Sequence, residues 1–191
     1  VVGVHLQDGG VAELRGEGGD LRLLRLEVLG QRLQLGLRLV RGVVGLDTGS
    51  VDYPGAAVLT AAGAVRAGAG MVRYFGPPQV GQRILDRFPN VVVGQGRVQA
   101  LVLGSGWGER KDRGVVARAV EAGVPLVVDA DGLRHLPETG HPKVVLTPHA
   151  GELARLLGNS RAEVEADPLA AVLTASRSTG CTVLLKGATQ Y

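Results

Sequence analysis

From Gly42 onward, short and mostly apolar runs recur between segments with helical periodicity. The runs lie at 43–46, 71–74, 91–93, 100–103, 125–128, 144–146 and 182–185, and the helical patterns at 54–67, 80–87, 113–122, 151–157 and 168–178. Apolar runs without polar alternation suit strands that are covered on both faces, as in a parallel sheet. The alternation therefore predicts a doubly wound, mostly parallel α/β sheet flanked by helices, in which ligands bind beyond the carboxyl ends of the strands.

Residues 1–40 have a different sequence pattern. Apolar stretches at 1–6 and 11–14 flank Gln7-Asp8-Gly9-Gly10, which predicts a hairpin with an Asp-Gly turn. Alternation at 24–28 and 33–39 indicates further short strands, although so monotonous a composition also suits a linker. We expect two parts: a short β-rich or linker segment at 1–40, and the α/β domain at 41–191.

Composition and charge exclude several classes of protein. A chain of 191 residues with 45% hydrophobic and 20% charged residues is ordinary for a globular domain. The net charge of +3 comes from scattered basic residues with few aromatics, which argues against nucleic-acid binding and suits small anionic ligands. No apolar run is long enough for a membrane span, and the single cysteine, Cys181, precludes an intramolecular disulfide. We expect a cytoplasmic protein that binds no membrane.

Two glycine-rich turns follow predicted strands. In the first, at 48–57, the helix that begins at Pro54 offers free amides to an anion, but a purely structural turn is the more common role of such a segment. The second, Gly104-Ser105-Gly106-Trp107-Gly108, lacks the spacing of the dinucleotide fingerprint. Trp107 suits packing against the sheet end better than stacking on a ligand ring.

Three later strand ends carry candidate functional side chains. Asp129 and Asp131 suit a metal-bound water or a ribose hydroxyl, or equally the cap of a turn. Pro148 presents His149 at the next strand end, where Glu152 suits either hydrated Mg²⁺ or a helix cap. The segment Lys186-Gly187-Ala188-Thr189-Gln190 suits phosphate contact, without the Walker arrangement.

Taken together and in this order, the motifs resemble the ADP/ATP-dependent NAD(P)H-hydrate dehydratase family, whose fold is ribokinase-like. The resemblance runs from about Arg41 to Thr189 and is carried by five blocks, at 53–59, 68–72, 127–133, 146–152 and 185–188. It implies an enzyme that uses ADP or ATP, with Mg²⁺, to phosphorylate and then dehydrate damaged (hydrated) NADH or NADPH. This activity is a form of nicotinamide nucleotide repair.

The resemblance also implies roles for individual residues. Ala57, Gly106 and His149 would contact the hydrate, and Glu152 would act on Mg²⁺ through water. The adenine nucleotide and its phosphates would lie along Lys186, Gly187, Ala188, Thr189 and Gln190. Members of the family often form oligomers, so a homo-oligomer is expected.

Two departures from the family pattern qualify these expectations. Ser105 and Trp107 stand where the family usually has Pro and then Leu. The family's catalytic base is an aspartate in a Gly-Ser-Gly-Asp or Gly-Thr-Gly-Asp motif, and no such motif follows Lys186. The catalytic residue is therefore not assigned, and we expect the 191-residue chain to be inactive or nearly so, as a version of the enzyme that lacks its carboxyl-terminal part. A ribokinase-like small-molecule kinase and a non-catalytic nucleotide-binding remnant are the open alternatives.

Overall fold

The computed structural model describes residues 3–7, 11–15, 42–109, 112, 114–137 and 142–191. Contacts divide the chain into two units, Val1–Val40 and Arg41–Tyr191. In the first unit, β1 (Gly3–Gln7) pairs antiparallel with β2 (Val11–Arg15), so the two expected hairpin strands are present. The expected Asp-Gly turn and the candidate strands at 24–28 and 33–39 lie outside the described residues.

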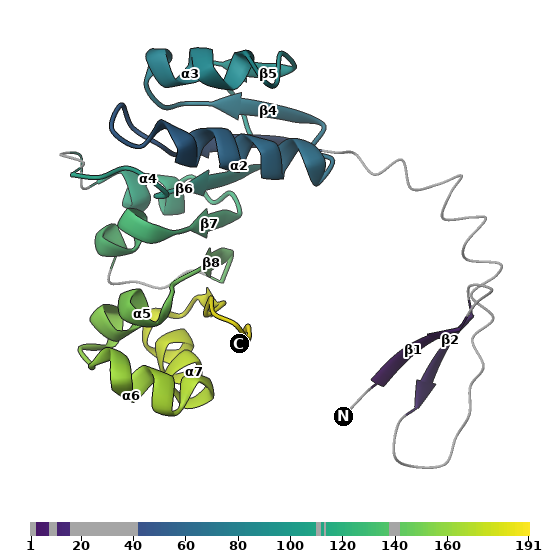
Figure 1. Cartoon of the computed structure of the whole chain (residues 1–191), viewed down its shortest axis with the longest axis vertical. Coiled ribbons are helices and arrows are strands. Elements are labelled where there is room, and N and C mark those ends of the chain that lie inside the picture. Colours follow the sequence, from purple (N-terminus) through teal and green to yellow (C-terminus); the bar gives the residue numbers. More distant parts are fainter. Residues whose placement is uncertain (1–2, 8–10, 16–41, 110–111, 113, 138–141) are drawn as a thin grey trace. The chain divides into compact units, whose positions relative to one another are not determined.

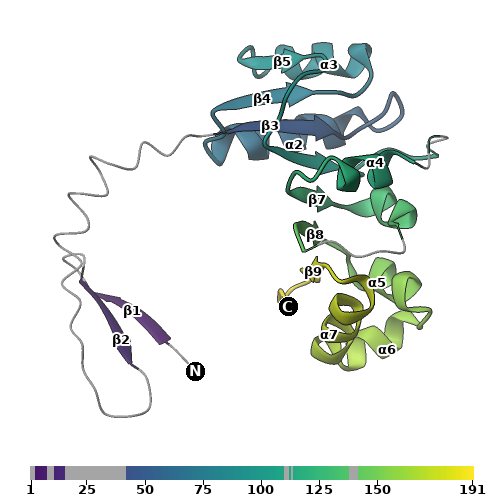
Figure 2. The same ribbon diagram turned by 180° about the vertical axis from the view of Figure 1, so that it is seen from behind.

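The second unit is built on a seven-stranded parallel sheet in the order β5-β4-β3-β6-β7-β8-β9 (Figures 1 and 2). Its strands are β3 (Val43–Asp47), β4 (Met71–Tyr74), β5 (Val91–Val93), β6 (Ala100–Leu103), β7 (Leu126–Val128), β8 (Val144–Leu146) and β9 (Thr182–Val183). The prediction of a parallel α/β sheet is thus confirmed. The strand order changes direction between β3 and β6, which is the position where ligands bind in sheets of this class.

The helices are α2 (Pro54–Arg66), α3 (Pro78–Leu85), α4 (Val115–Glu121), α5 (Ala150–Leu157), α6 (Arg161–Ala166) and α7 (Pro168–Thr179), with a 3₁₀ helix, η1, at Ala130–His135. Helix α2 lies in front of β3 in Figure 1 and behind it in Figure 2, so it covers one face of the sheet. In both views α5, α6 and α7 gather at the β9 end. Among the described residues, no helix is long and apolar enough to cross a membrane.

Local signals explain where several helices begin. Pro54 occupies the first turn of α2, where its missing N–H costs nothing. Asp167 caps α7 by accepting a hydrogen bond from the Ala170 amide at 3.0 Å. Sequence reasoning missed helix α6, although Ser160 and Glu163 form a capping box, a signal that is visible in the sequence.

Two groups of buried side chains form the core. One lies between α2, α3 and strands β3 to β5, and includes the fully buried Leu46, Tyr74 and Ile84. The other lies between α4 to α7 and strands β6 to β9, and includes Leu146 and Leu153. Burying each aliphatic side chain of this size contributes about 1.5–3 kcal/mol. The core therefore fixes the strands whose carboxyl ends carry the candidate site residues.

Candidate functional site

The candidate site lies along the carboxyl edge of the sheet. Because the strands are parallel, the loops after β3, β6, β7, β8 and β9 all emerge there. In strand order these loops bring Gly49, Ser105, Asp129, Thr147 and Lys186 to the same edge. All five motifs singled out in the sequence therefore meet on one side of the molecule.

The two glycine-rich turns pack tightly against each other. The Gly49 amide donates a hydrogen bond to the Ser105 carbonyl at 2.7 Å. A Cβ atom at Gly106 would lie 2.5 Å from that of Ala56, at a φ of +68°. Only glycine fits so close an approach with this backbone conformation. The ring of Tyr53 lies beside Gly108, so the turn after β6 rests on the start of α2.

Trp107 is a packing residue in this structure. Its side chain is buried, and its indole N–H donates to the carbonyl oxygen of Asp47 at 2.8 Å and to the Asp47 Oδ1 at 3.2 Å. The structure therefore agrees with the prediction that Trp107 packs against the end of the sheet. A cavity of about 390 Å³ opens beside it, lined by Asp47, Gly49, Ser50, Phe75, Gly76, Pro77 and Trp107.

Asp129, which follows β7, is the centre of a polar cluster. Its Oδ2 accepts a hydrogen bond from the Ser105 hydroxyl at 2.8 Å, and its Oδ1 accepts one from the Thr147 hydroxyl at 2.9 Å. Its Oδ1 also forms a salt bridge with the Lys186 ammonium. One carboxylate thus joins side chains from the loops after β6, β8 and β9.

The surroundings of Asp129 favour its charged form. Partial burial alone raises the pKa of the Asp129 carboxyl, but the hydrogen bonds from Lys186, Ser105 and Thr147 outweigh burial and bring this pKa below its usual value. The neighbouring Ala130 is held at a φ of +49°, a conformation that is uncommon for a residue with a side chain. Asp131, in contrast, accepts a hydrogen bond from the Gly108 amide at 2.9 Å.

His149 and Glu152 form the capping box of helix α5. The His149 Nδ1 accepts from the amides of Gly151 at 3.0 Å and Glu152 at 3.3 Å. The Glu152 carboxylate accepts from the His149 amide at 2.8 Å, and its Oε1 lies 3.2 Å from the His149 Nε2. These contacts place the proton of a neutral imidazole on Nε2. About half of the His149 side chain stays exposed, so the ring remains accessible to a ligand.

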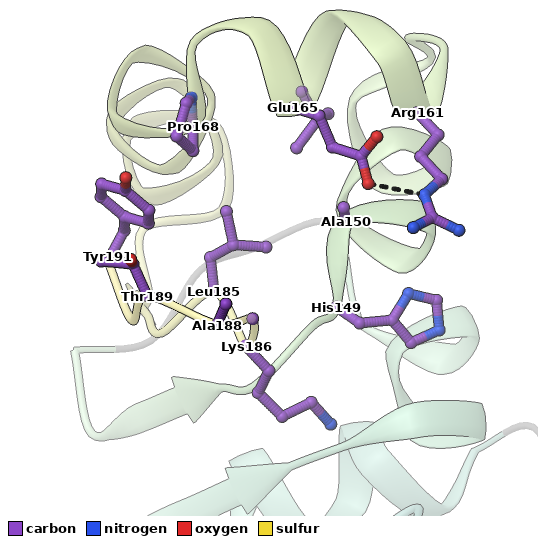
Figure 3. A pocket seen from close by; sticks show the side chains of 12 residues that line it. His149, Ala150, Arg161, Glu165, Pro168, Leu185, Lys186, Ala188, Thr189 and Tyr191 are labelled. Atoms are coloured by element: carbon purple, nitrogen blue, oxygen red, sulfur yellow. Dashed lines mark hydrogen bonds and ion pairs between the residues drawn. The ribbon is translucent and has the colours of Figure 1, made fainter.

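A cavity of about 620 Å³ adjoins the loop after β9. It is lined by His149, Ala150, Arg161, Val164, Glu165, Pro168, Leu185, Lys186, Gly187, Ala188, Thr189 and Tyr191. Figure 3 shows the Lys186 side chain pointing away from Tyr191 and Pro168, toward the neighbouring strands of the sheet. The Lys186 amide donates to the Pro148 carbonyl at 2.8 Å, which fixes this loop beside His149.

The residues expected to bind ligands fall into two groups. Lys186, Gly187, Ala188 and Thr189 share the 620 Å³ cavity with His149, whereas Gln190 does not line it. Gly106 lies in the turn on the other side of Asp129, and Ala57 is completely buried beneath Gly49. Among the described residues, no group of three His, Cys, Asp or Glu side chains is placed to hold a metal ion.

Sequence reasoning missed the contacts that join the two groups. Ser105 and Thr147 bind the Asp129 carboxylate, yet neither was a candidate site residue. Ser105 itself was the available signal, because it places a hydroxyl donor directly beyond the predicted strand at 100–103.

Comparison with known proteins identifies the family. A sequence model described as NAD(P)H-hydrate dehydratase matches residues 44–191. The bifunctional NAD(P)H-hydrate repair enzyme of Mycobacterium tuberculosis is 41% identical over 165 residues, which is 78% of this chain and 33% of that protein. The ADP-dependent (S)-NAD(P)H-hydrate dehydratase of Xanthomonas campestris is 33% identical over 175 residues, covering 79% of this chain and 60% of that protein.

Solved structures share the fold. The ADP/ATP-dependent NAD(P)H-hydrate dehydratase of Bacillus subtilis, co-crystallised with ATP and Mg²⁺, aligns with a TM-score of 0.71 at 25% identity, over 78% of this chain and 59% of that chain. A ribokinase-like superfamily protein from Enterococcus faecalis aligns with a TM-score of 0.69 at 21% identity, over 78% of this chain and 58% of that chain.

The parallel sheet and the row of loops at its carboxyl edge thus give the chain a ribokinase-like α/β fold. Within that class, the chain belongs to the NAD(P)H-hydrate dehydratase family. It spans about a third of the length of the first curated relatives that it matches.

Proposed function

We propose that residues 44–191 form the hydrate-binding and nucleotide-binding part of an ADP/ATP-dependent NAD(P)H-hydrate dehydratase. The observation that carries the proposal is the arrangement of the carboxyl edge, where the Gly104–Gly108 turn and the Lys186–Gln190 loop lie on either side of Asp129. The relatives' names add the substrate class, hydrated NADH or NADPH, and the phosphoryl donor, ADP or ATP.

The proposed reaction is a nicotinamide repair. Phosphorylation converts the hydroxyl of the hydrate into a phosphate, which is a good leaving group, and its departure restores the ring double bond. Gly106 and His149 would bind the hydrate, and the buried Ala57 would support this pocket from beneath Gly49. The protein's main contribution is to hold the two reactants in a productive geometry.

The nucleotide would occupy the cavity beside the loop after β9. Its phosphates would lie at Lys186, the only cationic side chain among Lys186, Gly187, Ala188, Thr189 and Gln190. Gly187 and Ala188 are exposed residues, and their amides are proposed as further donors for phosphate oxygens. Gln190 donates its side-chain N–H to the Gly187 carbonyl at 2.7 Å and thereby closes the loop.

Mg²⁺ is proposed as a partner of the nucleotide. It binds through phosphates and a few carboxylates and keeps several water molecules, so it needs no cage of protein ligands. We propose that Glu152 acts on it through water. The side chain is already held by His149, yet each carboxylate oxygen has a further lone pair for a water molecule. A bound Mg²⁺ would neutralise phosphate charge during transfer.

The base that activates the hydroxyl is proposed to be an aspartate of a Gly-x-Gly-Asp motif, which residues 187–191 do not contain. Residues 44–191 are proposed to bind the hydrate and the nucleotide, and turnover requires this base in addition. The test is a repair assay with hydrated NADPH, Mg²⁺ and either ADP or ATP, in which recovery of the reduced-nicotinamide absorbance is followed.

The assay has two arms. The chain is tested alone and joined at Tyr191 to the segment that follows the matched region in the Xanthomonas relative. Recovery in the joined protein, with calorimetric binding of ADP or ATP by the chain alone, supports the proposal. Phosphorylation of a thiazole or pyrimidine alcohol instead would favour the small-molecule kinase, and binding without turnover in the joined protein would favour a non-catalytic binder.

Two further properties are proposed on narrower grounds. The free and buried thiol of Cys181 suits a reducing compartment, so we propose a cytoplasmic protein, which cell fractionation would test.

Strand β9 lies at an edge of the sheet, next to the exposed Leu184. Exposed edges favour self-association, so we propose a homo-oligomer; a clean monomer in light scattering would contradict it.

A further inference from the structure

The ammonium group of Lys186 is held in place by contacts within the protein. Lys186 lines the 620 Å³ cavity, yet its side chain points away from Tyr191 and Pro168 (Figure 3) and forms a salt bridge with the Asp129 Oδ1. The Thr147 hydroxyl donates to this same oxygen at 2.9 Å. Lysine is otherwise a flexible side chain with many rotamers, so the pairing selects one position for its charge.

A second set of contacts connects Asp129 to the other side of the site. Its Oδ2 accepts a hydrogen bond from the Ser105 hydroxyl at 2.8 Å. The Ser105 carbonyl in turn accepts one from the Gly49 amide at 2.7 Å. A continuous path of polar contacts therefore runs from the turn after β3 to Lys186, through Ser105 and Asp129.

The backbone around Asp129 restricts how far this path can move. The Asp129 carbonyl accepts a hydrogen bond from the Gly132 amide at 3.0 Å, and the Asp129 amide donates to the Leu103 carbonyl at 3.0 Å. Gly104 packs directly on this segment, with no room for a side chain. The backbone that carries the carboxylate is thus held by its own loop and by the end of β6.

We propose that Asp129 is a positioning residue that holds the Lys186 ammonium for the phosphates of the nucleotide, and that Ser105 couples this hold to the Gly104–Gly108 turn. The inference rests on the proposed function, because it takes a nucleotide phosphate as the partner of Lys186. Ser105 does not line the 620 Å³ cavity, so it would not affect nucleotide binding if only residues in direct contact with the nucleotide mattered. The proposal predicts instead that Ser105 contributes to nucleotide affinity.

The first measurement needs no nucleotide. Acetic anhydride labels exposed amines, and mass spectrometry reports the rate at each lysine. We expect Asp129→Asn to raise the labelling rate of Lys186 severalfold and Ser105→Ala to raise it less, because the ammonium is then less firmly held. Lys143, whose side chain donates to the Gly123 carbonyl, serves as the internal reference and should not change.

The second measurement is calorimetric titration with ADP and Mg²⁺. We expect Asp129→Asn to weaken ADP binding by about tenfold, the loss of roughly one charge-assisted contact. Ser105→Ala should weaken it severalfold, and Ser105→Thr should restore it because the hydroxyl is retained. Ser178→Ala is the matched control, since in the described part of the chain that hydroxyl bonds within α7, to the Ala175 carbonyl at 3.1 Å.

The outcomes separate this inference from the proposed function. Unchanged Lys186 labelling in both variants would overturn the positioning role, whatever binds in the cavity. Unchanged ADP affinity in both variants, with normal binding by the wild type, would also overturn it while leaving the proposed function intact. If the wild type binds neither ADP nor ATP, the nucleotide part of both proposals fails. Should Asp129→Asn not fold, as judged by circular dichroism, the serine variants decide.

Discussion

A Cβ atom at Gly104 would lie 2.1 Å from the carbonyl oxygen of Asp129. It would also lie 2.8 Å from the Cα of Gly132, and Gly104 itself has a φ of +107°. The turn after β6 and the segment after β7 are therefore in direct backbone contact, which brings Ser105 within hydrogen-bonding distance of Asp129.

This contact predicts that Gly104→Ala lowers the free energy of unfolding by more than about 3 kcal/mol, since the new methyl group combines a steric clash with a disfavoured backbone conformation. Urea unfolding measures the loss. Gly123→Ala is the control: its φ is +70°, but no heavy atom lies within 4 Å of the new methyl group. It should cost only about 1–2 kcal/mol. Equal losses in the two variants would contradict the packing argument.

At Gly63, unlike Gly104, an added side chain should stabilise the fold. It lies inside helix α2 at an exposed position, and a Cβ atom there would meet nothing within 4 Å. Because alanine restricts the unfolded chain and favours the helix, Gly63→Ala should raise the free energy of unfolding by about 0.5–1 kcal/mol. Thermal unfolding followed by circular dichroism reports the change, and a lowered melting temperature would show that this helix has an unrecognised constraint.

The Asp129 cluster predicts a dependence of stability on pH. Since the pKa of the folded Asp129 carboxyl lies below its usual value, its contribution is present above the unfolded pKa and is lost as pH falls through the folded pKa. At pH 7, Asp129→Asn should therefore be less stable by about 1–2 kcal/mol. The difference from wild type should shrink below about pH 4. Urea midpoints between pH 3 and 7 test this; a constant difference would exclude the carboxylate as its source.

The capping box of α5 predicts both a stability effect and a tautomer. Glu152→Ala removes the acceptor of the His149 amide and should cost about 1 kcal/mol, whereas Glu152→Gln, which retains an acceptor, should cost less. In nitrogen NMR spectra, the neutral His149 ring should carry its proton on Nε2 in the wild type. Protonation on Nδ1 would contradict the observed hydrogen bonds.

Much of the fold could be predicted because its signals are local. The apolar runs are long enough to mark every strand of the sheet, and Pro54 and Asp167 mark helix starts through contacts within one turn. Boundaries were less accurate at the last strand, where β9 ends at Val183 although the apolar run continues to Leu185. There the strand ends for a tertiary reason: the chain turns back, and the Leu185 amide donates to the Tyr191 carbonyl at 3.0 Å.

The position of the candidate site at the carboxyl edge of the sheet could be predicted, but the contacts between its side chains could not. Parallel topology alone puts His149 and Lys186 at the same edge, and an isolated bridge pairs their backbones. Asp129 contacts Ser105 on one side and Lys186 on the other. These contacts depend on the order of the strands in the sheet, which the periodicity of the sequence does not encode. The roles proposed for Ala57, Gly106 and Glu152 rest on family resemblance and remain predictions.

The strand order also has a consequence for how the molecule assembles. From β7 to β9, each strand pairs with the one before it in the chain, so this half of the sheet grows in one direction. During synthesis, Ser105, Asp129, Thr147 and Lys186 therefore leave the ribosome in the order in which their strands are added. Parallel pairing requires long crossovers and is slow to form. The Asp129–Lys186 salt bridge joins the loops after β7 and β9, so it reports when β9 has docked beside β8.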